Sequence, residues 1–213
     1  GLYETFDEGQ NFRHFPNLPV SQFYKVAVNN RAPFYDVLGG AQDLGTLMGP
    51  SRTLNREGVR NQDWYVPLGS DGQGVAFDPE DDDISYMATQ GGNWYRHDKR
   101  TEETIDIQPQ PEPGEAPERW NWDAPILISP HSNRVYLASQ RLWQSDDRGN
   151  SWTAISGDLT RDVNRYELEM MGRVWSVDAL YHNGAMSKYS TITGMTESPL
   201  AAGVLYTASD DGL

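Results

Sequence analysis

Ile126-Leu127-Ile128-Ser129-Pro130, followed by Arg134-Val135-Tyr136-Leu137-Ala138-Ser139, carries the clearest structural signal in the sequence. A short apolar strand passes through a Ser-Pro turn into a second strand, which has a tyrosine at its middle and small residues at its end. Serine and proline favour turns, and short apolar runs between turn residues favour strands. This stretch therefore predicts two consecutive antiparallel strands.

The same pattern recurs three more times along the chain. The other copies are 26–29 with 33–40, 75–79 with 84–89, and 192–195 with 204–209. Tyr35, Tyr86, Tyr136 and Tyr206 mark the second strands, at intervals of 51, 50 and 70 residues. A period near fifty with short strands is typical of a four-stranded propeller blade. We therefore expect positions 26, 75, 126 and 192 to begin equivalent sheets.

The predicted fold class is all-β, a β-propeller of four-stranded antiparallel blades with about four blade equivalents. Residues 1–213 are interpreted as one partial propeller, with blade phases near 20–45, 70–107, 122–157 and 173–213. Four blades is the low end for propellers. We therefore expect the remaining blades to come from residues outside this sequence or from a partner chain.

Composition agrees with many short strands and narrows the range of partners. There are 20 Gly and 13 Pro, which leave little room for long helices. The formal net charge of −14 argues against nucleic acid and anionic membrane surfaces as partners. There is no cysteine, and no apolar run long enough for a membrane helix, so we expect no disulfide and no membrane insertion.

Two segments interrupt the repeat. Residues 108–118 are acidic and rich in proline, which predicts an extended surface loop. Residues 158–172 mix a few apolar residues with charged ones. They predict one or two helical turns or a long loop, lying across a face of the propeller.

An eight-residue motif appears twice in phase with the repeat. Residues 145–152 match the pattern Ser/Thr-x-Asp-x-Gly-x-x-Trp, known as the Asp-box, and residues 5–12 form a looser copy. In such a turn the Asp accepts hydrogen bonds from its own backbone, the Gly takes a positive φ, and the aromatic residue packs under the sheet. We assign structural roles to the motif residues, namely Thr5, Asp7, Gly9, Phe12, Ser145, Asp147, Gly149 and Trp152.

The motif and several flanking runs resemble one protein family. The runs that carry the resemblance are 20–30, 39–45, 49–51, 142–149, 155–160, 198–200 and 209–213. They are similar to the large secreted bacterial Asp-box (BNR-repeat) β-propeller proteins, which are related to the sortilin ten-bladed domain and often labelled glycosyl hydrolases. The resemblance implies that this chain is an internal portion of a longer protein with an extracellular or periplasmic location.

Three acidic loops could reach the mouth of a propeller channel, where ligands usually bind. They contain Asp43, Asp71 and Asp123. A pair of carboxylates with aromatic platforms is what glycoside hydrolysis requires. We therefore predict a pair made of Asp43 with Asp71 or Asp123. The substrate-binding candidates are Gln42, Trp120 and Trp122.

These residues also have a purely structural interpretation. Asp43 and Asp71 could simply close Gly-rich turns, and Trp120 and Trp122 could pack between blades. The whole chain likewise has two possible functions. One is a glycoside-hydrolase-like protein with a carbohydrate ligand; the other is a sortilin-like propeller that binds a protein or peptide, or a scaffold subunit of an assembly.

No cofactor or metal site is predicted with a specific pattern. The histidines show no metal-ligand spacing. The run Asp78-Pro79-Glu80-Asp81-Asp82-Asp83 has enough oxygen ligands for calcium. It lies in an expected turn between two strands, which favours a solvated turn over a calcium site.

Overall fold

The computed structural model describes residues 3–14, 21–175 and 187–212, and within these ranges it is built mainly from β-strands. Three sheets contain four antiparallel strands each. The first sheet consists of β3 (Phe23–Val28), β4 (Asp36–Ala41), β5 (Gly45–Pro50) and β6 (Tyr65–Leu68). The second consists of β7 (Val75–Phe77), β8 (Ile84–Thr89), β9 (Asn93–Asp98) and β10 (Glu103–Asp106). The third consists of β11 (Ile126–Ile128), β12 (Val135–Ala138), β13 (Leu142–Ser145) and β14 (Thr153–Ala154).

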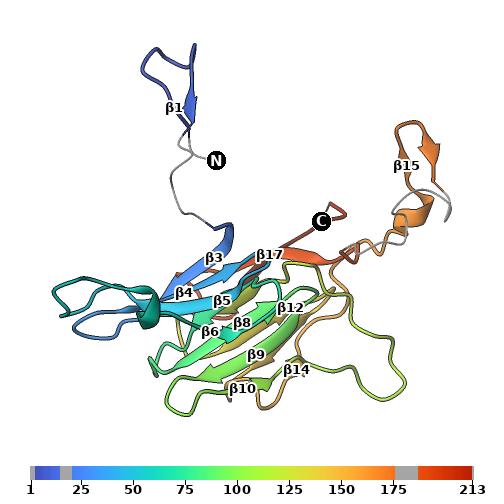
Figure 1. Ribbon diagram of the computed structural model, residues 1–213. Helices are drawn as coiled ribbons and strands as arrows, with labels where there is room; N and C mark the ends of the chain where they lie inside the picture. The colour runs from blue at the N-terminus through green and yellow to red at the C-terminus, as the bar shows by residue number, and fades with distance from the viewer. Residues whose placement is uncertain (1–2, 15–20, 176–186, 213) are drawn as a thin grey trace.

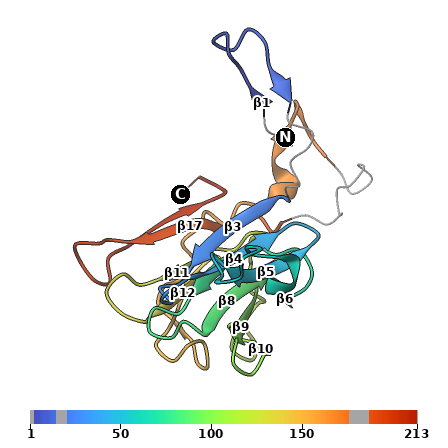
Figure 2. The same cartoon turned by 60° about the vertical axis from the view of Figure 1, so that its left-hand side comes forward.

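The remaining strands form pairs. The fourth sheet contains β17 (Ile192–Glu197) and β18 (Leu205–Ser209). The N-terminal hairpin contains β1 (Tyr3–Glu4) and β2 (Arg13–His14), and the distal hairpin contains β15 (Glu169–Met170) and β16 (Arg173–Val174). Two 3-10 turns are present, η1 (Asn61–Asp63) and η2 (Arg165–Glu167). Both hairpins stand away from the four sheets (Figures 1 and 2).

Each four-stranded sheet is a simple meander, because every strand pairs with the next strand in sequence. The first strands of successive sheets also contact one another: β3 contacts β7, β7 contacts β11, and β11 contacts β17. Positions 26, 75, 126 and 192 fall in these four strands and thus in four different sheets. The all-β architecture with repeated four-stranded antiparallel sheets is confirmed, and the closed ring of a propeller stays a prediction.

The pairing register corrects one predicted equivalence. Tyr86, Tyr136 and Tyr206 occupy matching places, since they pair with Ala76, Leu127 and Thr196 of the preceding strand. In the first sheet the matching residue is Leu38, which pairs with Ala27, whereas Tyr35 lies before β4 and is exposed. The matching position in the first sheet is buried and requires a large apolar side chain. Leu38 satisfies this requirement, and unlike tyrosine it has no hydroxyl group that needs a hydrogen-bond partner.

The core lies between neighbouring sheets. Leu38 and Met48 of the first sheet pack against Val75, Phe77 and Met87 of the second. A larger cluster joins the second sheet to the third; it contains Ile84, Tyr86, Ala88, Trp94, Ile107, Trp120, Ala124, Val135, Leu137 and Trp143. Burying each large apolar side chain contributes about 1.5–3 kcal/mol, so these two interfaces hold the sheets face to face.

The 145–152 Asp-box forms the turn between β13 and β14 as predicted. The Ser145 hydroxyl donates to Asp147 at 2.8 Å and accepts the N–H of Gly149 at 2.8 Å. Ser151 donates its N–H and its hydroxyl to the same carboxylate. Gly149 has φ +82°, which favours glycine. Trp152 donates its indole N–H to the carbonyl of Ile107 at 2.7 Å, which anchors the turn to the second sheet.

The 5–12 Asp-box repeats this turn in the N-terminal hairpin. Thr5 donates to Asp7 at 2.8 Å and accepts the N–H of Gly9 at 3.0 Å, and Asn11 donates twice to Asp7. The looser copy therefore has the same hydrogen bonds as the Asp-box at 145–152. Its aromatic residue does not follow the prediction, because Phe12 is 65% exposed and packs under no sheet.

Neither of the two interrupting segments, 108–118 and 158–172, belongs to one of the four-stranded sheets. No strand or helix lies between residues 107 and 125, and this loop is tied back by Arg141, which pairs with Glu115 and Glu118. Residues 158–172 contain η2 and β15, and Arg119 bonds to Asp158 and Thr160 at their start. The expected placement across a face is not seen for the distal hairpin, which projects outward (Figure 1). The predicted phase 173–213 also includes residues 176–186 and 213, which lie outside the described residues.

Candidate functional site

Three connections meet at one end of the first strands. The β4–β5 turn contains Asp43, and the connection from β6 to β7 contains Asp71. Gly72 donates its N–H to the carbonyl of Ala41 at 3.0 Å, which holds these two segments together. In the next sheet Gly91, in the β8–β9 turn, likewise bonds to the carbonyl of Trp122, directly before Asp123. The three predicted acidic loops therefore emerge at the same end of the sheets.

Asp43 and Asp71 are in direct contact. The backbone N–H of Asp43 donates to Oδ1 of Asp71 at 2.8 Å. Asp43 has φ +60°, a left-handed conformation that Asp tolerates better than most residues, and its side chain is exposed. Asp71 thus also serves the structural role of fixing a neighbouring turn, while the carboxylate of Asp43 stays accessible to solvent.

Asp123 is brought to the cluster by an ion pair across two sheets. Its Oδ2 lies 3.2 Å from Nζ of Lys25, at the start of the first sheet. Its Oδ1 is buried and has no hydrogen-bond partner among the described residues, and its backbone N–H donates to the side-chain oxygen of Asn121 at 3.0 Å. The carboxylate of Asp123 therefore reaches the first sheet through Oδ2 alone.

Tyr24, in the first strand of the first sheet, experiences the charge of all three carboxylates. Loss of surrounding water raises the pKa of its phenol, and the negative charges of Asp71, Asp43 and Asp123 raise the pKa further. We define the acidic cluster as Tyr24, Lys25, Asp43, Asp71 and Asp123. Sequence reasoning missed Tyr24 and Lys25. The signal that could have found them is the polar pair at the start of an otherwise apolar first strand.

The predicted aromatic platforms behave differently from each other. Trp120 is only 6% exposed and packs against Gly92, where any side chain would collide with its ring, so it belongs to the core. Trp122 is half-buried, and both tryptophans line a cavity of about 210 Å³ together with Glu118, Ser187 and Lys188. The backbone N–H of Trp122 donates to the Ser187 hydroxyl at 2.8 Å. Trp122 has the exposed surface that a platform beside Asp123 needs, and the buried Trp120 does not.

Gln42 lies next to the acidic cluster in sequence. Its backbone N–H donates to the carbonyl of Gln22 at 3.0 Å, and its side chain is half-buried. Further in, Gln73 is fully buried, and neither polar atom of its amide has a hydrogen-bond partner within the described residues. A buried amide without partners is costly, which makes Gln73 an unexplained polar group close to this end of the sheets.

The acidic run 78–83 lies at the opposite end of the sheets, where basic side chains occupy its carboxylates. Asp78 is buried, accepts two hydrogen bonds from Arg148 and one from the Tyr86 hydroxyl, and also accepts two backbone N–H groups of its own turn. Arg31 pairs with Asp83, and Arg100 pairs with Asp81. In the part of the chain that the structure describes, no group of three His, Asp or Glu is arranged to hold a metal ion.

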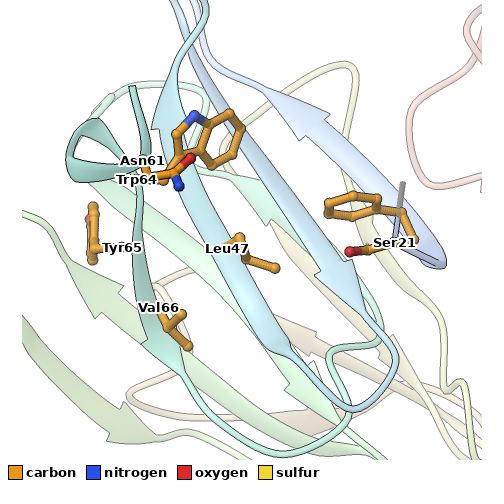
Figure 3. A pocket seen from close by; sticks show the side chains of 7 residues that line it. Ser21, Leu47, Asn61, Trp64, Tyr65 and Val66 are labelled. Atoms are coloured by element: carbon orange, nitrogen blue, oxygen red, sulfur yellow. The ribbon is translucent and has the colours of Figure 1, made fainter. Parts of the chain in front are cut away.

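A cavity of about 530 Å³ is of another kind. It lies on the face of the first sheet that points away from the second and is lined by Phe23, Leu47 and Trp64; Leu47 and Trp64 are labelled in Figure 3. Gly39 and Gly49 let these two rings lie flat on the sheet, since a side chain at either glycine would collide with them. The lining is mostly apolar, so it suits packing against another surface better than chemistry.

Comparisons with known proteins identify no family. No family model matches the chain, and a search of curated proteins finds no significant match. Among the described residues, no helix is both long enough and apolar enough to cross a membrane.

Proposed function

We propose that this chain is part of a secreted Asp-box β-propeller and that its acidic cluster binds a carbohydrate and hydrolyses a glycosidic bond. The observation that carries the proposal is that the loops of Asp43, Asp71 and Asp123 emerge at the same end of the sheets, with Asp43 hydrogen-bonded to Asp71 and Asp123 paired with Lys25. Each carboxylate comes from a different connection, and each was selected from the sequence for this role. The remaining blades of the propeller come from outside this sequence or from a partner chain.

The chemistry of the cluster suits a sugar. Carboxylate oxygens accept hydrogen bonds from adjacent hydroxyl groups, the Lys25 ammonium donates, and the Tyr24 ring offers a face for stacking. The transition state of glycoside cleavage carries positive charge on the sugar ring, and the two carboxyl groups act as proton donor and as base or nucleophile. Three carboxylates against one lysine leave net negative charge where this positive charge would develop.

The contacts suggest different roles for the three acids. Asp43 has an exposed carboxyl group and can exchange protons with a ligand. Asp71 uses Oδ1 to hold the turn of Asp43, so its carboxylate is fixed beside that of its neighbour. Asp123, tied to Lys25, stabilises positive charge on the sugar ring. Trp122 supplies the neighbouring aromatic surface.

A second candidate function is the binding of a basic peptide or protein, as the sortilin-like interpretation of the sequence suggests. The cluster holds three acids against one lysine, and the whole chain has a net charge of −14. Such a surface attracts cationic partners and depends on ionic strength. In this case the chain acts as a binding or scaffold subunit and performs no reaction.

A glycan array with the purified chain tests the proposal, followed by a reducing-sugar assay on any glycan that binds. The substitution Asp71→Asn should abolish turnover and weaken binding. The control Glu57→Gln removes one negative charge from the exposed β5–β6 connection at the opposite end of the first sheet, and it should leave both unchanged. Binding of no glycan, together with salt-sensitive binding of a lysine-rich peptide that Asp71→Asn weakens, would instead favour the second function.

A further inference from the structure

Most basic side chains of this acidic chain are held by carboxylates. The chain has 31 acidic residues against 17 basic ones, so carboxylates are in excess. The basic residues in ion pairs include Arg13, Lys25, Arg31, Lys99, Arg100, Arg119, Arg134, Arg141 and Arg148. A group of arginines that pairs with no carboxylate is therefore unexpected in this chain, and it points to a partner outside the chain.

The connection between β5 and β6, residues 51–64, contains such a group. Arg52, Arg56 and Arg60 are all exposed, and none of them forms an ion pair with a carboxylate of the described residues. The same connection contains only two acids, Glu57 and Asp63. Oδ2 of Asp63 accepts the backbone N–H of Arg60 at 2.7 Å, which fixes the backbone and leaves the guanidinium unpaired. Three guanidinium groups are thus open to solvent on one connection.

The backbone of this connection is ordered by its own hydrogen bonds. The carbonyl of Asn55 accepts the N–H of Gly58 at 3.0 Å, and Gly58 has φ +80°. Arg56 lies inside this turn. At the end of the connection the ring of Trp64 lies on Gly49, where any side chain would collide with it. The connection, teal in Figure 1, extends beyond the end of the first sheet. An ordered backbone lowers the entropic cost of binding a partner.

An apolar side chain lies among the three arginines. Leu54 is 91% exposed, and Val59 is 38% exposed. We define the arginine loop as Arg52, Leu54, Arg56 and Arg60. An acidic protein segment can present both carboxylates to the guanidinium groups and an apolar side chain to Leu54. A polysaccharide or a nucleic acid has anionic groups but no aliphatic side chain, so the combination favours a protein partner.

The charge of the whole chain also favours a short anionic segment. A long polyanion or an anionic membrane would meet the net charge of −14, which repels it. A short acidic segment contacts the arginine loop alone. Charges further away than about 8–10 Å are largely screened at ordinary ionic strength. The local positive charge of the loop therefore decides the interaction with a short segment.

We propose that the arginine loop binds an acidic segment of a partner protein, in which carboxylates flank an apolar side chain. Guanidinium groups bind carboxylates through two parallel hydrogen bonds, and arginine is enriched at protein interfaces. Leu54 contacts the apolar side chain of the partner. The loop follows β5, whereas Asp43 lies in the turn before β5, so the two surfaces are at opposite ends of the first sheet. The inference does not rest on the proposed function.

Binding of a short fluorescent peptide of glutamate and leucine, followed by anisotropy at low ionic strength, tests this proposal. The triple variant Arg52→Gln, Arg56→Gln and Arg60→Gln should bind the peptide at least about tenfold more weakly, because three charge pairs are lost. Leu54→Ala should weaken binding about threefold, because an apolar contact is lost. Added salt should weaken binding by the unchanged chain.

A matched control removes the same charge elsewhere. The triple variant Arg100→Gln, Arg134→Gln and Arg173→Gln changes side chains outside the first sheet and should bind the peptide within about twofold of the unchanged chain. Equal binding by the two triple variants would overturn the proposal, and so would the absence of peptide binding by the unchanged chain.

Two further measurements separate the alternatives. If a short oligogalacturonate binds as tightly as the peptide and Leu54→Ala weakens neither, the loop recognises anionic groups in general, and the assignment to a protein partner is wrong. Asp71→Asn should leave peptide binding unchanged, because Asp71 lies at the other end of the first sheet. Failure of the peptide test therefore leaves the proposed function untouched, and failure of the glycan test leaves this proposal untouched.

Discussion

The two Asp-box turns have the same hydrogen bonds and opposite surroundings. In both, a hydroxyl and a carboxylate two residues apart satisfy the backbone of the turn. The turn at 145–152 lies against the second sheet through Trp152 and Arg148. The turn at 5–12 stands alone, and Phe12 meets solvent. Eight residues are thus enough to form the turn, whereas its contribution to stability depends on the neighbouring sheet.

Removing the carboxylate of Asp78, which accepts hydrogen bonds from Arg148 of the Asp-box at 145–152, should have the largest effect on the free energy of unfolding. Asp78→Ala leaves the Tyr86 hydroxyl without its partner, and it leaves the Arg148 guanidinium with only the carboxylate of Asp81, 3.9 Å away, in a mostly buried place. We expect a loss of about 3 kcal/mol in the free energy of unfolding, because an unpaired buried charge is costly. Denaturation by urea measures this loss.

Asp146→Ala is the matched control for this prediction. Asp146 pairs with Arg134, and its side chain is well exposed. Exposed pairs contribute little, so the loss should stay below about 1 kcal/mol. Similar losses for the two variants would show that contact with the second sheet adds nothing to the stability of the turn.

Removing the aromatic anchor should have an intermediate effect. Trp152→Ala deletes a half-buried ring and its hydrogen bond to Ile107, so we expect a loss of about 2 kcal/mol in the free energy of unfolding. Phe6→Ala removes an exposed ring of the other turn and should change stability by no more than about 0.5 kcal/mol. A loss for Phe6→Ala as large as that for Trp152→Ala would break the comparison. The measurement is the shift of the urea midpoint.

The smallest expected effect concerns the Asp carboxylate that both turns contain and that each turn hydrogen-bonds internally. Hydrogen bonds from the Asn11 side chain, the Asn11 backbone and the Thr5 hydroxyl lower the pKa of Asp7 from 3.8 to about 2. The pKa of Asp147 is lowered too, chiefly by the hydroxyl of Ser151. A folded-state pKa below the unfolded one stabilises the turn above the unfolded pKa, and this stabilisation is lost as the pH falls through the folded value.

Carboxyl-carbon NMR titration checks this prediction. Asn11→Ala removes the strongest donor and should move the pKa of Asp7 back toward 3.8. Gln10→Ala is the control: it keeps the backbone N–H groups of the turn and should leave the pKa of Asp7 near 2. If the pKa of Asp7 lies at its ordinary value in the unchanged chain, the hydrogen bonds of the turn do not form in solution.

Much of the fold could be predicted from local pattern. The turn residues and apolar strands placed β7, β8, β11, β12, β17 and β18 correctly, because period and turn chemistry are local properties. The fourth strand β6 was not predicted, since it follows a long polar connection and pairs only with β5. Asp43 and Asp71 lie in contact because their loops leave the same end of neighbouring sheets, and their catalytic role stays a prediction. Lys25 was missed because it reaches Asp123 across two sheets, a relation that no local pattern carries.

The sequence by itself determined the strands, the two Asp-box turns and the repeat, because these depend on backbone preferences and on hydrogen bonds between residues a few positions apart. Only the tertiary structure decided which aromatic rings are buried, which carboxylates are taken by arginine, and which lie at the other end of the sheets. Trp120 and Trp122 illustrate the difference: they are two residues apart in one loop and line the same cavity, but Trp120 is buried in the core and Trp122 is half-buried. Burial depends on what a neighbouring sheet presents, and that is settled only when distant segments pack together.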